Sequence, residues 1–172
     1  MSRISLAVLA ALVLGHLAPS PAAARVVERR EYGNWVYEYN VSNQVTSCVA
    51  SRYYSNAQFS VRLYGDMMDV LFWRNDFRWP WDRAMGDAVV TVSGNRYRLE
   101  ASTPRRGDGA RSALLILNLR PRDYGAFFRD LQRARKLRID LWNGKAYPVD
   151  LTGSRRAMDA AWDCWRRRDT GS

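Results

Sequence analysis

The segment LTGSRRAMDAAWDCW (residues 151–165) predicts a short helix near the end of the chain, and that helix carries one of only two cysteines. Thr152 or Ser154 can cap its N-terminus by offering a side-chain oxygen to the free amides of the first turn. One side of the helix carries small and apolar residues at helical spacing, followed by an arginine: Ala157, Ala161, Cys164, Trp165 and Arg168. That side can press closely on a sheet. Residues 166–168 are all arginine, which favours the negative end of the helix dipole.

The first 24 residues have the pattern of a secretory signal peptide. Arg3 gives a positive start, residues 4–17 are mainly apolar, and small residues end at Ala24, where we expect cleavage. The apolar run is too short for a comfortable membrane span, and no later stretch approaches one. We therefore expect a periplasmic or secreted protein of a Gram-negative bacterium, with one β-rich domain over residues 25–172 and no membrane span.

Export makes a disulfide between the two cysteines chemically reasonable, because disulfides persist outside the cytoplasm. Cys48 lies near the start of the expected mature chain, and Cys164 lies on the last helix. We predict that they pair, so that one covalent bond ties the first strands to the last helix.

Cleavage would also remove His16, the only histidine. A Ser-His-Asp triad, a Cys-His pair and a histidine-based zinc site are then excluded. No nucleotide-binding or serine-hydrolase motif occurs in the chain. We expect no catalytic residue, no metal and no cofactor.

The charge balance points to anionic partners. The formal charge of the whole chain is +10, and removal of Arg3 leaves +9. Outside the cytoplasm the polyanions are lipid headgroups, lipopolysaccharide and acidic glycans, and we expect no nucleic acid. The alternative is a soluble charged surface that reflects codon usage, since net charge informs on solubility as much as on partners.

Alternating apolar and polar residues predict an antiparallel sheet of about seven to nine strands. The expected strands are 35–40, 45–54, 58–64, 67–73, 88–93, 96–101, 112–119, 136–142 and 147–151. Residues 25–31 are expected to be frayed. Turn signals are Gly94-Asn95 and Asn143-Gly144, the latter as a type I′ turn. An amphipathic helix is expected after Pro121, and Pro148 favours a sheet edge. The fold class is α+β: a β-rich sandwich or partial barrel with two late helices and one disulfide.

An aromatic and basic segment follows the strand at 67–73. Its candidate ligand-binding residues are Arg74, Arg78, Trp79, Trp81 and Arg83. Aromatic faces and guanidinium groups together suit a sugar ring or an anionic headgroup. The alternative is that these rings fill the core of the sheet.

The two ends of the chain resemble the small periplasmic proteins of the invasion-associated locus B type. Tyr32-Gly33-Asn34-Trp35 and Cys48 carry the resemblance at the start, although Asn34 stands where the family usually has Asp. Val149-Asp150-Leu151-Thr152-Gly153-Ser154, together with Ala157, Ala160 and Cys164, carries it at the end. The resemblance implies an exported envelope protein with no established catalytic residues.

Two functions remain open at this stage. The first is a non-catalytic envelope protein that binds an anionic or glycan component, or a periplasmic or outer-membrane protein. The second is a hydrolase of envelope polymers that uses paired carboxylates, which must lie roughly 5–10 Å apart. The clustered candidates are Asp66, Asp69, Asp76 and Asp82.

Overall fold

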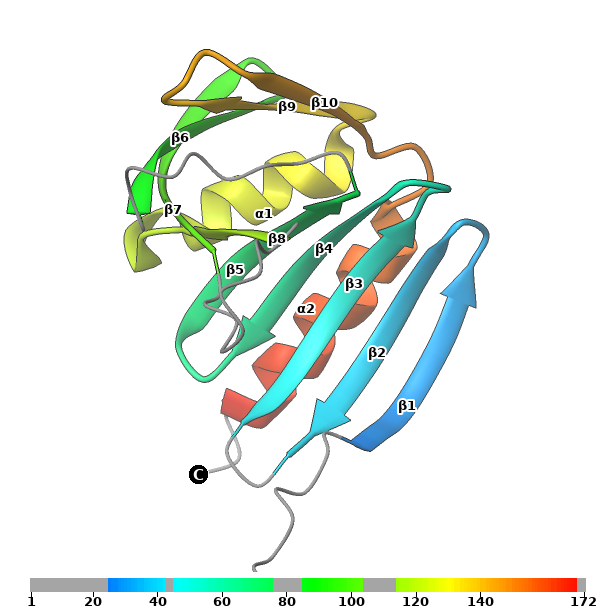
Figure 1. The fold of residues 1–172 in the computed structure, drawn as a ribbon. Helices are drawn as coiled ribbons and strands as arrows, with labels where there is room; N and C mark the ends of the chain where they lie inside the picture. Colours follow the sequence, from blue (N-terminus) through cyan, green and yellow to red (C-terminus); the bar gives the residue numbers. More distant parts are fainter. Residues whose placement is uncertain (1–24, 43–44, 76–84, 104–113, 170–172) are drawn as a thin grey trace, which may run out of the picture.

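The computed structural model describes residues 25–42, 45–75, 85–103 and 114–169. They form ten strands, one short 3-10 helix and two α-helices (Figure 1). The strands are β1 (Arg25–Tyr32), β2 (Trp35–Val41), β3 (Thr46–Tyr53), β4 (Ala57–Tyr64), β5 (Met67–Arg74), β6 (Met85–Val92), β7 (Asn95–Ser102), β8 (Leu114–Asn118), β9 (Lys136–Leu141) and β10 (Ala146–Asp150). The helices are η1 (Pro121–Asp123), α1 (Tyr124–Arg133) and α2 (Arg155–Asp169).

All ten strands belong to one antiparallel sheet, in the order β1-β2-β3-β4-β5-β8-β7-β6-β9-β10. The sheet curls but does not close. Its β10 edge instead meets β3 and β5 through side chains: the Tyr54 hydroxyl, just after β3, donates to the Asp150 carbonyl at 2.6 Å, and the Phe72 and Tyr147 rings lie 5.5 Å apart. The β-rich α+β class with two late helices is confirmed, in its partial-barrel version. Pro148 lies in the β10 edge strand, as predicted.

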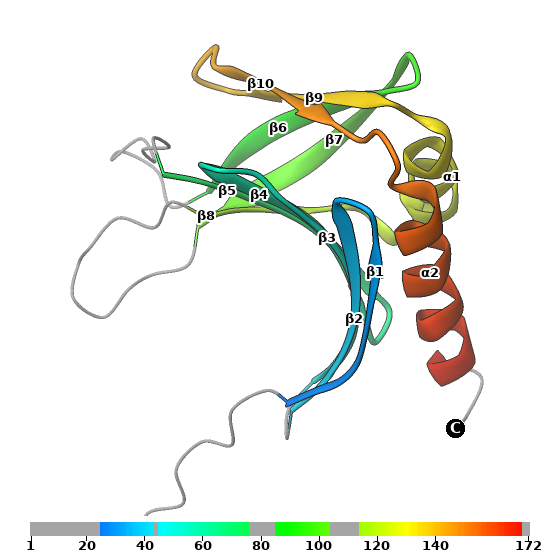
Figure 2. The same cartoon turned by 90° about the vertical axis from the view of Figure 1, so that its right-hand side faces the viewer.

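Both helices cover the same face of the sheet (Figure 2). Ala157, Met158 and Ala161 are fully buried, so α2 lies close to the strands beneath it. Phe127 of α1 contacts Tyr97 edge-to-face at 4.9 Å. The two helices meet where the Phe128 and Trp162 rings stack at 4.5 Å.

The N-terminal strands are joined to α2 and to the segment before it near both ends of this helix. The predicted Cys48–Cys164 disulfide is present, with the two Cα atoms 6.0 Å apart. At the other end of α2, the indole of the fully buried Trp35 donates to the Thr152 carbonyl at 3.1 Å. The segments that carry the sequence resemblance at the two ends of the chain therefore lie against each other.

The expectation that residues 25–31 are frayed is wrong, and the sheet has ten strands where seven to nine were expected. The charged N-terminal segment forms β1, which pairs along its length with β2. Its charges have local partners: Arg29 bonds Glu38 at 2.7 Å, and Arg30 bonds Glu28 at 2.5 Å. Charged residues suit an edge strand, because one of its sides has no neighbouring strand.

Two turns also differ from expectation. The β6–β7 hairpin turns at Ser93-Gly94, one residue earlier than the expected Gly94-Asn95. Ser93 and Gly94 have the positive φ values of a type I′ turn, 52° and 83°. The β9–β10 turn is not type I′. The Gly144 amide donates to the Leu141 carbonyl at 3.0 Å, and Gly144 is the one residue of this turn with a positive φ, 79°. Asn143 instead uses its side chain, which accepts from the Lys145 amide at 3.1 Å.

Loss of the disulfide is expected to destabilise the protein strongly. The bond spans 116 residues of sequence, and closing a loop of that size contributes about 4–5 kcal/mol in the chain-entropy model. The double variant Cys48→Ala/Cys164→Ala should lose about that much free energy of unfolding in urea. A loss below about 1 kcal/mol would contradict the chain-entropy account.

Gly86 is expected to tolerate no side chain, because a Cβ there would lie 2.6 Å from the Trp142 ring. Gly86→Ala should cost about 1–3 kcal/mol of unfolding free energy, as overpacking does. Gly125→Ala in α1 is the matched control, since its nearest neighbour is the flexible end of Arg129 at 3.6 Å. The control should be neutral or stabilising; equal losses in both variants would refute the steric explanation.

Candidate ligand-binding groove

The aromatic and basic segment predicted as a ligand surface is only partly described. Arg78, Trp79, Trp81 and Arg83 lie outside the described residues. Arg74 ends β5 on the helix-covered face, where its guanidinium lies 5.5 Å from the centre of the Tyr147 ring. This contact joins β5 to β10, so Arg74 helps to pack the curled sheet.

A groove with the required chemistry lies elsewhere, between the strands β1–β4 and the C-terminal end of α2. It consists of two adjoining cavities of about 290 and 360 Å³ that share Tyr39 and Arg168. We call their combined lining the α2 groove. Besides the shared pair, the lining is Thr46, Cys48, Leu63, Gly65 and Trp165 in the first cavity and Glu28, Arg30, Tyr37, Cys164 and Arg167 in the second.

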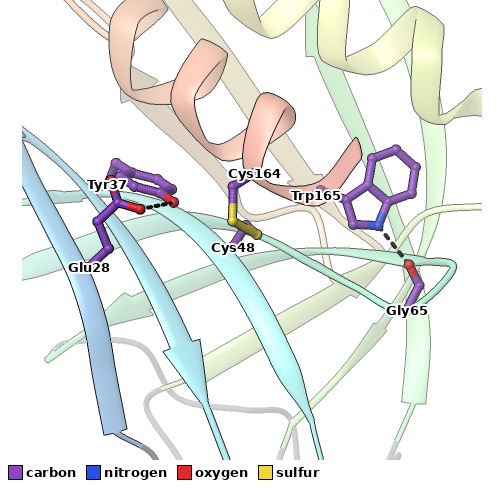
Figure 3. Close-up of a disulfide and its surroundings, with 6 residues drawn as sticks. All are labelled: Glu28, Tyr37, Cys48, Gly65, Cys164 and Trp165. Atoms are coloured by element: carbon purple, nitrogen blue, oxygen red, sulfur yellow. Dashed lines mark hydrogen bonds between the residues drawn. A yellow bond between two sulfur atoms is a disulfide. The ribbon is translucent and has the colours of Figure 1, made fainter. Parts of the chain in front are cut away.

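The disulfide lies between the two cavities, with Cys48 lining one and Cys164 the other (Figure 3). On one side of it, the Trp165 indole donates to the Gly65 carbonyl at 2.6 Å, which ties α2 to the β4–β5 turn. On the other side, the Tyr37 hydroxyl donates to Glu28 at 3.3 Å. The groove is therefore held by a covalent bond and by hydrogen bonds on both flanks.

The positive charge of the groove comes from the end of the helix. Arg168 places its guanidinium 4.2 Å from the centre of the Tyr39 ring, within the range of a cation–π contact. Among the described residues that line the groove, Glu28 is the one carboxylate, against Arg30, Arg167 and Arg168. The formal charge of this lining is thus +2, and Glu28 already bonds both Arg30 and Tyr37.

The Tyr37 phenol is held in its neutral form. Burial raises the pKa of Tyr37 to about 12, and the adjacent Glu28 carboxylate adds to the rise because it repels a phenolate. Tyr37 therefore presents a neutral aromatic ring and hydroxyl to the groove at any physiological pH.

Sequence reasoning did not identify this groove. In the sequence, residues 166–168 indicate only the negative end of the helix dipole, and Tyr37 and Tyr39 belong to the strand expected at 35–40. A combined pattern was available: Arg168 follows Cys164 by one helical turn, and Tyr39 pairs with Cys48 in the β2–β3 register. A predicted disulfide therefore places Arg168 near Tyr39.

The carboxylates of the hydrolase hypothesis do not gather beside the described aromatic residues. Asp69 is 1% exposed and forms an ion pair with Arg62. Asp66 lies in the exposed turn between β4 and β5, and Asp76 and Asp82 lie outside the described residues. In the described part of the chain, no group of three or more acidic, cysteine or histidine side chains could hold a metal ion.

No helix in the described ranges is both long and apolar enough to cross a membrane. In comparisons with known proteins, no family model, no curated protein and no solved structure matched this chain. Any functional assignment therefore depends on the residues of the site.

The raised pKa of Tyr37 predicts a specific loss of stability in alkali. The folded-state pKa of about 12 exceeds the ordinary value of 10.0, so the neutral Tyr37 phenol stabilises the folded state relative to the unfolded chain. This contribution to the free energy of unfolding is complete below pH 10 and is lost as the pH rises towards 12. Urea unfolding between pH 9 and 12 should show a steeper decline for the wild type than for Tyr37→Phe. Parallel declines would show that Tyr37 titrates normally.

Proposed function

We propose that this chain is a non-catalytic envelope protein that binds an anionic envelope component in the α2 groove. The observation that carries the proposal is the described lining of the groove, which has three arginines and one carboxylate beside Tyr37, Tyr39 and Trp165. The expected export of the chain and the resemblance of its two ends to periplasmic proteins support an envelope location.

Guanidinium groups bind phosphate and carboxylate through paired, charge-assisted hydrogen bonds. The cavities, at about 290 and 360 Å³, suit a single headgroup or a short charged saccharide. The aromatic side chains beside the arginines add surface on which the uncharged part of such a ligand can pack.

The groove needs no rearrangement to receive a ligand. Its α2 wall is fixed by the disulfide and by the Trp165–Gly65 hydrogen bond, and Arg168 is oriented by the Tyr39 ring. Because the Arg168 side chain is partly ordered before binding, less conformational entropy is lost when the ligand enters.

The test is co-sedimentation with lipopolysaccharide and with vesicles of phosphatidylglycerol or neutral phosphatidylcholine. Arg167→Gln/Arg168→Gln should weaken binding to one or both anionic probes about tenfold or more, as expected when charge-assisted contacts are lost. The matched control is Arg96→Gln/Arg98→Gln, which removes the same charge from exposed positions on β7.

Measuring binding at several salt concentrations helps to distinguish a specific site from attraction by net charge. Binding should weaken as salt rises in both the wild type and the control variant, because exposed charges are screened beyond roughly 8–10 Å. Equal weakening in the two double variants would mean that net charge alone attracts the ligand. That result, or binding to neither anionic probe, would refute the proposed role of the groove.

A further inference from the structure

The face of the sheet opposite the helices carries a separate cavity. It has a volume of about 230 Å³ and is lined by Gln58, Ser60, Leu71, Trp73 and Leu114 from β4, β5 and β8. Side chains alternate along a strand, so Gln58 and Ser60 point away from the face that carries the buried Phe59 and Val61. Figure 2 shows that neither helix covers this side of β4 and β5. The cavity and the α2 groove therefore lie on opposite faces of the sheet.

We propose that this cavity is a carbohydrate site that binds an uncharged oligosaccharide of N-acetylated hexosamine. None of the five described residues that line it is charged, in contrast to the α2 groove. Trp73 is 38% exposed, although a tryptophan in a strand usually buries more of its surface. The site joins an exposed aromatic ring to an amide, a hydroxyl and two aliphatic side chains, which is the combination that a sugar ring needs.

A second aromatic side chain extends this surface along one row of the sheet. Tyr53 pairs with Gln58, and Gln58 pairs with Trp73, in the registers of β3–β4 and β4–β5. Tyr53 is 51% exposed. Neighbouring strands lie about 4.8 Å apart, so the Tyr53 and Trp73 backbones are separated by roughly 10 Å with an amide between them. An oligosaccharide lying across the strands can place one ring on Trp73 and a later ring towards Tyr53.

The polar groups of the cavity are already oriented. The Gln58 side-chain amide donates to the Ser60 hydroxyl at 3.1 Å, and the Ser60 and Ser51 hydroxyls are hydrogen-bonded at 2.8 Å. Ser60 and Ser51 are 1% and 2% exposed, so this network forms a fixed floor. The Gln58 carbonyl oxygen makes no hydrogen bond with the described residues and can accept one from a ligand.

The aliphatic side chains favour an acetylated sugar over a plain hexose. Leu71 and Leu114 are half-buried at the edge of the cavity. An acetamido group presents a methyl group, which suits these leucines, and an N–H, which suits the Gln58 carbonyl oxygen. A plain hydroxyl at the same position satisfies Gln58 but leaves the leucine surface in contact with water.

The experiment is a calorimetric titration of the full protein with the β-1,4-linked trimer of N-acetylglucosamine, and with cellotriose, the β-1,4-linked glucose trimer that carries a hydroxyl in place of each acetamido group. The wild type should bind the acetylated trimer more tightly. Trp73→Ala should weaken this binding about tenfold or more, because the stacking surface is lost. Gln58→Leu should reduce the preference for the acetylated trimer.

Met67→Ala is the matched control. It truncates an apolar side chain on the same strand and the same face as Trp73, with similar exposure, 42% against 38%. It should bind the acetylated trimer like the wild type. Far-ultraviolet circular dichroism and a thermal melt of each variant test whether the fold is retained, because removal of Trp73 changes the near-ultraviolet spectrum by itself.

Three results would overturn the proposal. The first is no measurable heat with the acetylated trimer up to about 10 mM, the weak limit of a specific site. The second is unchanged binding in Trp73→Ala together with loss in Arg167→Gln/Arg168→Gln, which would assign the sugar to the α2 groove. The third is sedimentation of the wild type as a dimer that Trp73→Ala dissociates, without sugar binding, which would make this face an interface between copies.

Discussion

The disulfide between Cys48 and Cys164 is the constraint on which the rest of the structure depends. It fixes the end of α2 to β3, and the Trp35–Thr152 hydrogen bond fixes the other end of the helix beside β2. The ten-stranded sheet is open, with β1 and β10 as its edge strands. The helix that is tied at both ends keeps the β1–β4 half folded around a common core.

The same constraint creates the α2 groove. A helix end that must reach the sheet to form a disulfide brings its last turn with it, and here that turn is rich in arginine. The Arg168 guanidinium thereby lies 4.2 Å from the centre of the Tyr39 ring, and Arg167 lines the same cavity as Tyr37. These arginines complement the helix dipole and also line a defined cavity.

The two faces of the sheet have different chemistry for a simple physical reason. The face under the helices excludes water and carries aromatic and aliphatic residues such as Phe59 and Val61. The opposite face has no helix over β4 and β5, yet Ser51 and Ser60 are buried there. Small hydroxyl side chains in the middle of that face leave room for a cavity, and Gln58 and Trp73 form its wall.

The sequence by itself determined the antiparallel class, both late helices, the edge position of Pro148 and the disulfide, because periodicity and cysteine count are local or compositional signals. It did not predict β1, because a charged segment is expected to lie in solvent unless the strand that pairs with it is known. The position and type of the turns at Ser93-Gly94 and Asn143-Gly144 were not predicted correctly, because several neighbouring dipeptides can adopt the φ values that a turn needs. Only the tertiary structure decided where the grooves lie, because their walls come from segments that are distant in sequence, as Tyr39 and Arg168 show.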